Sequence, residues 1–161
     1  MFKKLMNKKL LKNQKGLTLV ELLAVIVILA IIAAIAIPAI GNIIENSRYN
    51  AVKADGINVL NAAQLYYTDN PNGDPDVTGT STQVTIAQLK SAGYIENPGK
   101  IPPDATVSNS NPKKLTVSTG ITYSGSKTVT FNNVSISDIN ANKDKGSKTG
   151  NRNIDPVPTT P

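Results

Sequence analysis

The feature that most constrains this chain is an apolar run close to its N-terminus. Between Leu17 and Ile40, 21 of 24 residues are apolar, and the exceptions are Thr18, Glu21 and Pro38. As a helix this run would be about 36 Å long, at roughly 1.5 Å per residue. A bilayer core is about 30 Å thick. The run therefore predicts a membrane-spanning helix.

The charges around this run predict its orientation. Everything before Gly16 is basic or neutral, with six positive charges from Lys3, Lys4, Lys8, Lys9, Lys12 and Lys15. The positive-inside rule then places the N-terminus in the cytoplasm and the chain beyond about Gly41 outside. From Leu17 onward there are 11 basic and 11 acidic side chains. The net charge of +6 thus belongs to the leader, and we expect no nucleic-acid binding.

The composition of the chain argues against an enzyme. It has no histidine and no cysteine, which excludes Ser-His and Cys-His catalysis and the common zinc sites. Asp69, Asp74 and Asp76 surround a turn, but they lack the twelve-residue spacing of a calcium loop. We therefore interpret them as turn-forming acids and expect no metal and no cofactor.

Glu21 is the unusual residue of the apolar run. A carboxylate near the centre of a bilayer costs on the order of 2.5–3.5 kcal/mol by insertion scales, less toward the edge. Three partners are open to it: Lys15, another subunit, or a new α-amino group. Cleavage after Gly16 would give Leu17 a free ammonium four residues from Glu21. Opposite charges about 4 Å apart attract by roughly 4 kcal/mol at an effective dielectric near 20, so pairing between copies could set their register.

The residues around this acid resemble a known processing motif. The segment Lys15-Gly16-Leu17-Thr18-Leu19-Val20-Glu21-Leu22-Leu23 is similar to the class III leader of type IV pilins and pseudopilins. The resemblance implies that a prepilin peptidase cuts between Gly16 and Leu17 and N-methylates Leu17. It places Glu21 at the fifth mature position, and Pro38 where the family commonly has a helix-loosening proline. The sequence departs from the family at Leu17, where phenylalanine is commonest.

Two other interpretations of the N-terminus remain open. Ala34-Ile35-Ala36 has the small-x-small pattern of a signal-peptidase site, which would release a secreted protein beginning at Ile37. The run could also be a plain anchor that keeps its leader. Either would fit a secreted or membrane-anchored binding module.

Beyond the apolar run, helical periodicity continues to about Asn70. One face of this stretch carries Tyr49, Val52, Val59, Leu60, Ala63, Tyr66 and Tyr67, which predicts a helix packed on a core. Pro38 lacks a backbone donor and Gly41 is flexible, so we expect the helix to kink there.

The remainder predicts a small head. Thr85-Ile86-Ala87-Gln88 is a capping box that opens a short helix closing at Gly93. Period-two patterns predict short strands, with a hairpin turn at 124–126; the strands are 115–118, 121–123, 128–131 and 134–136. The fold class expected is α+β, a long N-terminal helix against a small antiparallel sheet.

These predictions divide the chain into five segments. They are a basic leader (1–16), a membrane-spanning and filament-core helix (17–40), an amphipathic helix half (41–70), a head (71–139) and a polar, disordered tail (140–161).

The function expected is that of a structural subunit, either a type IV pilin or a pseudopilin of a secretion or competence system. As a precursor it would sit in the bacterial cytoplasmic membrane with its N-terminus inside. After cleavage it would join an extracellular filament. Its partners would be other copies of itself and the prepilin peptidase, and indirectly the assembly platform and its ATPase motor.

Overall fold

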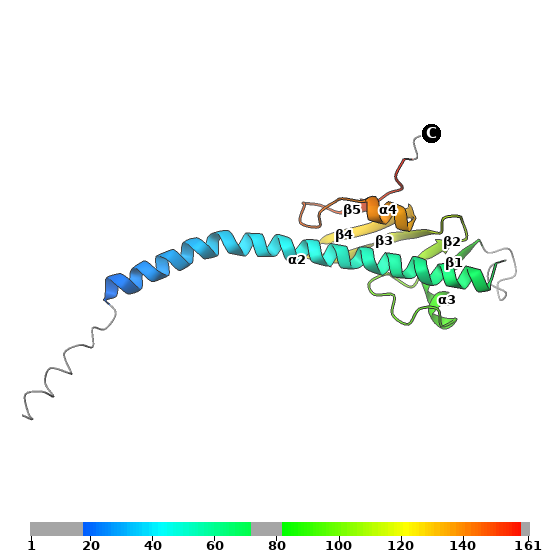
Figure 1. The fold of residues 1–161 in the computed structure, drawn as a ribbon, viewed down its shortest axis with the longest axis horizontal. Coiled ribbons are helices and arrows are strands. Elements are labelled where there is room, and N and C mark those ends of the chain that lie inside the picture. The colour runs from blue at the N-terminus through cyan, green and yellow to red at the C-terminus, as the bar shows by residue number, and fades with distance from the viewer. Residues whose placement is uncertain (1–17, 72–81, 159–161) are drawn as a thin grey trace, which may run out of the picture. The chain divides into compact units, whose positions relative to one another are not determined.

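The computed structural model describes residues 18–71 and 82–158. One long helix is followed by a small five-stranded sheet with two short helices, so the expected α+β class is confirmed. Figure 1 shows the sheet lying along the C-terminal half of the long helix. In chain order the elements are α2 (Leu19–Asp69), β1 (Gln83–Thr85), α3 (Ile86–Ser91), β2 (Thr106–Ser108), β3 (Lys114–Ser124), β4 (Lys127–Val134), α4 (Ile136–Ala141) and β5 (Arg152–Ile154).

Helix α2 belongs to two units. The described residues up to Ile40 contact mainly one another and form one compact unit, and the residues from Gly41 onward form a second one. All buried residues of the helix lie in the second unit, because the predicted stripe faces the sheet. The confirmed members are Tyr49, Val52, Val59, Leu60, Ala63, Tyr66 and Tyr67, and Gly56 and Ala62 join them.

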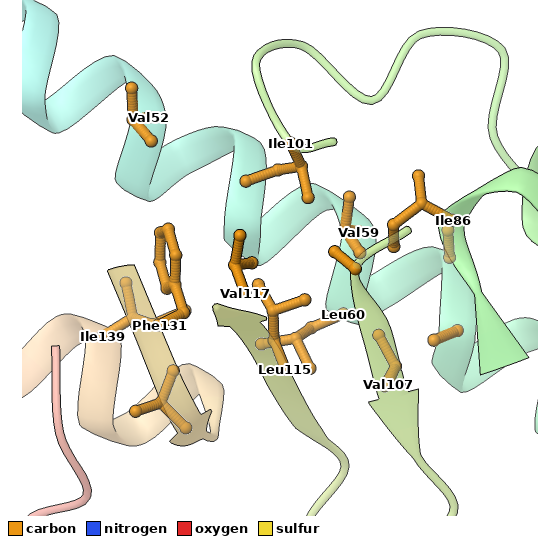
Figure 2. Close-up of a cluster of buried hydrophobic side chains, with 14 of the residues drawn as sticks. Val52, Val59, Leu60, Ile86, Ile101, Val107, Leu115, Val117, Phe131 and Ile139 are labelled. Carbon is orange, nitrogen blue, oxygen red and sulfur yellow. The ribbon is translucent and has the colours of Figure 1, made fainter. Parts of the chain in front are cut away.

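The core lies between this stripe and one face of the sheet. Figure 2 shows Leu60 of α2 beside Leu115 and Val117 of β3. Gly56 allows the closest approach, since a Cβ at that position would lie 3.0 Å from Cε1 of Phe131. Phe131 is fully buried there. A glycine in the helix interior, usually unfavourable, is thus used to bring helix and sheet together.

The sheet has the strand order β1-β2-β3-β4-β5. The first four strands pair antiparallel, but β5 runs parallel to β4, so the sheet is mixed and not purely antiparallel as expected. The hairpin predicted at 124–126 is present, because Ser124 pairs with Lys127 across a two-residue turn in which Gly125 has a φ of 55°. The predicted strands 115–118 and 121–123 are parts of one strand, β3, whose register is irregular between Val117 and Ile121.

Three local predictions have different outcomes. The capping box at Thr85 is confirmed, and α3 ends before Gly93, which has a φ of 80°. The strand predicted at 134–136 is wrong, because Ser135 instead caps α4. Its hydroxyl accepts from the Asp138 amide, and the Asp138 carboxylate accepts from the Ser135 amide at 2.8 Å. Strands β1, β2 and β5 were not predicted.

The tail also differs from the expectation of disorder between 140 and 158. Strand β5 pairs with residues 129–131 of β4, and Ile154 is fully buried in the core. Polar side chains reinforce this pairing: Thr130 Oγ1 donates to Asn153 Oδ1 at 2.9 Å, and Asn132 Nδ2 donates to Asp155 Oδ1 at 2.7 Å. A polar segment is therefore ordered by one apolar anchor and a ladder of side-chain hydrogen bonds.

Residues 142–148, here called the strap, contact α2 between Glu45 and Lys53 before β5 begins. The Tyr49 hydroxyl donates to Asn142 Oδ1 at 2.8 Å, and the Ser147 amide donates to Asn46 Oδ1 at 2.9 Å. Burial, followed by the nearby Asp144 charge, raises the pKa of Tyr49 to about 12. That hydroxyl therefore stays protonated and able to donate at neutral pH.

Gly146 is the point where the strap approaches α2 most closely. A Cβ there would lie 2.5 Å from Cβ of Tyr49 and 2.7 Å from the backbone oxygen of Glu45. We expect Gly146→Ala to lower the free energy of unfolding by roughly 1–3 kcal/mol, the usual cost of overpacking. Urea unfolding of the full chain in detergent measures it. Gly41→Ala is the matched control, because a Cβ at Gly41 meets nothing within 4 Å. An equal loss in both variants would contradict the prediction.

Candidate processing and assembly site

The beginning of α2 holds Glu21 in a local hydrogen-bond network. The Thr18 carbonyl accepts the first helical bond, from the Leu22 amide at 3.1 Å, so Thr18 is the N-cap. Glu21 Oε2 accepts from the Thr18 amide at 2.8 Å and from its hydroxyl at 3.0 Å. The Glu21 amide in turn donates to Thr18 Oγ1 at 3.2 Å. Thr18 and Glu21 thus form a capping box, which sequence reasoning missed although the T-x-x-E spacing signals it.

This capping box offers a second, purely local reason for an acidic residue at position 21. A capping acid is favourable at a helix N-terminus whether or not another copy is present. Yet its negative charge is not neutralised there, since within residues 18–71 and 82–158 no ion pair involves Glu21. The proposed cleavage site at Gly16 and Leu17, and the alternative partner Lys15, lie outside the described residues.

The apolar part of α2 is uncovered over its whole described length. No hydrophobic residue of α2 before Tyr49 is buried, and Leu19 is 84% exposed. Among the helices in the described part of the chain, α2 alone is long and apolar enough to cross a membrane. The exposed large hydrophobic side chains of α2 before Tyr49 are Leu19, Val20, Leu22, Leu23, Val25, Ile26, Val27, Ile28, Leu29, Ile31, Ile32, Ile35, Ile37, Ile40, Ile43 and Ile44.

The predicted kink residues lie inside this surface. Pro38 and Gly41 are both within α2, which continues as helix through them. A Cβ at Gly41 would meet nothing within 4 Å, so packing within this chain does not require a glycine there. Loosening of the helix at these two residues stays a prediction.

Glu45 forms the shorter of the two ion pairs in the described residues. Its carboxylate accepts from Lys127 Nζ at 2.7 Å and from Ser124 Oγ at 3.2 Å. Lys127 also donates to the Ser147 carbonyl, so this pair links α2, the β3–β4 hairpin and the strap. The hydrogen bond from Lys127 lowers the pKa of Glu45 although partial burial opposes it.

The lowered pKa of Glu45 predicts a pH-dependent contribution to stability. A carboxyl group whose pKa is lower in the folded state stabilises the fold at neutral pH. That contribution is lost as the pH falls through its folded-state pKa. We expect the stability difference between the wild type and Glu45→Gln to be largest near neutral pH and to shrink in acid. Urea titrations across the acid range measure it.

Exposed Glu96 provides the control for this pH series. It makes no hydrogen bond or ion pair within the ranges that the structure describes. Glu96→Gln should therefore give a small difference with no comparable pH dependence. A Glu45→Gln difference that stays constant between neutral and acidic pH would contradict the role of the ion pair.

The acids near the turn after α2 are only partly described. Asp69 accepts a hydrogen bond from the Tyr94 hydroxyl at 2.8 Å, and this bond raises the pKa of Tyr94. Asp74 and Asp76 lie outside the described residues. In the part of the chain with assigned positions, no group of three potential metal ligands comes together.

Comparison with known proteins identifies the N-terminal segment. Residues 11–37 match the prokaryotic N-terminal methylation motif, the signature of type IV pilins and prepilins. No curated protein and no solved structure gave a significant match. The matched segment contains Gly16, Leu17 and Glu21 and ends just before Pro38. This motif supports a type IV pilin-like or pseudopilin precursor, and with the apolar helix it indicates a membrane-anchored one. Proteins with this motif are structural, and the motif implies processing by a prepilin peptidase.

Proposed function

We propose that this protein is the structural subunit of an extracellular filament. A prepilin peptidase would cut between Gly16 and Leu17 and methylate Leu17. The mature chain would then polymerise through the apolar part of α2, with its head facing water. The observation that carries the proposal is the match of residues 11–37 to the methylation motif, together with a helix in which no hydrophobic residue before Tyr49 is buried.

An apolar surface of this extent must be covered both before assembly, in the membrane, and after it, in the filament. In lipid, a helix satisfies its own backbone hydrogen bonds and exposes apolar side chains to the acyl chains. In water, the same side chains must be covered, and other copies of the helix would cover them. One surface can therefore serve the membrane-held precursor and the filament in turn.

Glu21 would control the register of that assembly. The new ammonium of Leu17 in one copy would pair with Glu21 of its neighbour, and the attraction at about 4 Å is roughly 4 kcal/mol at an effective dielectric near 20. Each charge is costly in an apolar surrounding when it is alone. Axial positions that leave Glu21 unpaired would therefore be disfavoured. Pro38 and Gly41 would let the helix loosen as it moves from membrane to filament.

Cysteine cross-linking tests polymerisation directly, because the natural chain has no cysteine. In a filament, copies with Ile32→Cys should form disulfide-linked oligomers in the material sheared from cells. Ser126→Cys, on the exposed hairpin turn of the head, is the matched control and should give fewer of them. Finding the chain only as membrane-bound or released monomers would overturn the proposal in favour of a binding module.

A further inference from the structure

The described head has more basic than acidic side chains, and this excess lies in one region of it. At the start of the head, seven basic side chains and two acidic ones either lie close to Glu45, Tyr49 or Asp144 or belong to the strap. In the rest of the described head there are four basic side chains and six acidic ones. The first group comprises Arg48, Lys53, Lys127, Lys143, Lys145, Lys148 and Arg152, with Glu45 and Asp144.

Folding of the tail produces this segregation. Lys143, Lys145 and Lys148 are far from α2 in sequence, but the strap holds them beside Asn46 and Tyr49. Two further contacts fix the strap: the Tyr123 hydroxyl donates to the Gly146 carbonyl at 3.0 Å, and Lys53 Nζ donates to the Asn142 carbonyl at 2.7 Å. The lysines are thus held in place by the backbone that carries them.

Most of these strap and helix cations are free to meet a partner. Lys143, Lys145, Lys148 and Arg48 are exposed, and we call them the basal patch. Within the described residues, the one ion pair in the patch is between Lys148 and Asp144, at 3.8 Å and largely exposed. Such a pair contributes little and does not neutralise the patch.

The strap is held on residues of α2 that follow the apolar run closely in the sequence. Asn46 and Tyr49, which hold the strap, come six and nine residues after Ile40 in the same helix. If the apolar part of α2 is in a membrane, these are the first turns to leave it. Anionic lipid headgroups on the face of the membrane that carries the head attract cations held close to that face.

We propose that the basal patch binds the anionic lipid headgroups of the membrane that holds the precursor. The proposal rests on the membrane-held precursor of the proposed function. A second copy of the chain is the alternative partner, because the rest of its described head carries six acidic side chains against four basic ones. The position of the strap soon after the apolar run favours the membrane surface. Lipid contact would hold the head at the surface until assembly withdraws the helix.

Lysine acetylation of the full-length precursor in nanodiscs tests this inference. One set of discs is pure phosphatidylcholine and the other is an equal mixture with phosphatidylglycerol. Lys143, Lys145 and Lys148 should each react about fivefold more slowly in the anionic discs, and high salt should remove the difference. Exposed Lys90 is the internal control and should react equally in both.

Two outcomes would overturn the lipid assignment. One is equal reactivity of the three strap lysines in both kinds of disc. The other is protection that is the same in both lipids but rises with the number of copies per disc, which would assign the patch to a second copy. Incorporation into the discs and N-terminal processing are measured on the same samples. A failure of the proposed function is thereby distinguished from a failure of this inference.

Discussion

Glu21→Gln is expected to abolish filament formation while leaving membrane insertion and cleavage intact, and Glu21→Ala should do the same. Both changes remove the charge that would pair with the Leu17 ammonium of a neighbouring copy. That pair is worth roughly 4 kcal/mol at 4 Å and an effective dielectric near 20, or close to a thousandfold in an equilibrium constant. The quantity to measure is the amount of this chain in sheared filaments, relative to the amount in the membrane.

The capping box provides the matched control for Glu21. Glutamine at this position can still accept from Thr18 and so keeps the cap, whereas Thr18→Ala removes the cap and keeps the charge. Loss of an N-cap costs about 1 kcal/mol, a small effect on a helix of 51 residues. Thr18→Ala should therefore still form filaments. Abundant filaments from Glu21→Gln together with none from Thr18→Ala would show that Glu21 acts as a cap, not as a charge.

Gly16→Ala is expected to block processing almost completely. The bond proposed for cleavage follows a residue without a side chain, and a Cβ at that position would hinder close approach of the peptidase to the backbone. The uncut precursor should accumulate in the membrane. Its mass should exceed that of the mature chain by the mass of the leader, residues 1–16. Gly41→Ala is the matched control and should be processed normally. A shortened Gly16→Ala chain with the N-terminal sequence of the wild-type product would contradict the assigned site.

The long helix and its buried stripe were predictable because they follow from periodicity alone. Apolar residues that recur every three or four positions from Tyr49 to Tyr67 form one face of a helix, and in water such a face is stable when it packs on a core. The capping box at Thr85 and the turn at Gly125 were predictable for a similar reason. Each depends on hydrogen bonds or dihedral angles within a few residues.

The tail was not predictable in this way because its order is non-local. Residues 142–158 contain few apolar side chains, so composition predicts disorder. Their position instead depends on Ile154 reaching a core built by distant residues and on Asn153 meeting Thr130. The helix α4 was missed for a different reason. Ser135 and Asp138 have capping-box spacing, but the apolar pattern just before them suggested a strand.

The same distinction between local and non-local features applies to the candidate site. Gly16, Leu17 and Glu21 are identified by contiguous sequence, since the motif that contains them is local. The segregation of charge around Glu45 and Tyr49 is not, because the lysines that produce it come from the strap about a hundred residues later. Counting charges along the chain gives neutrality, and only the fold separates them.

Assembly through Glu21 requires a new amine at Leu17, and the mass of the N-terminal peptide of the mature protein tests directly whether that amine exists. Protein purified from cells should begin with Leu17 and carry one methyl group on its α-nitrogen. A chain that begins at Ile37 would indicate a secreted protein released by signal peptidase. One that keeps Met1 would indicate a simple anchor, and either result would contradict the charge-pair mechanism and the filament subunit proposed from it.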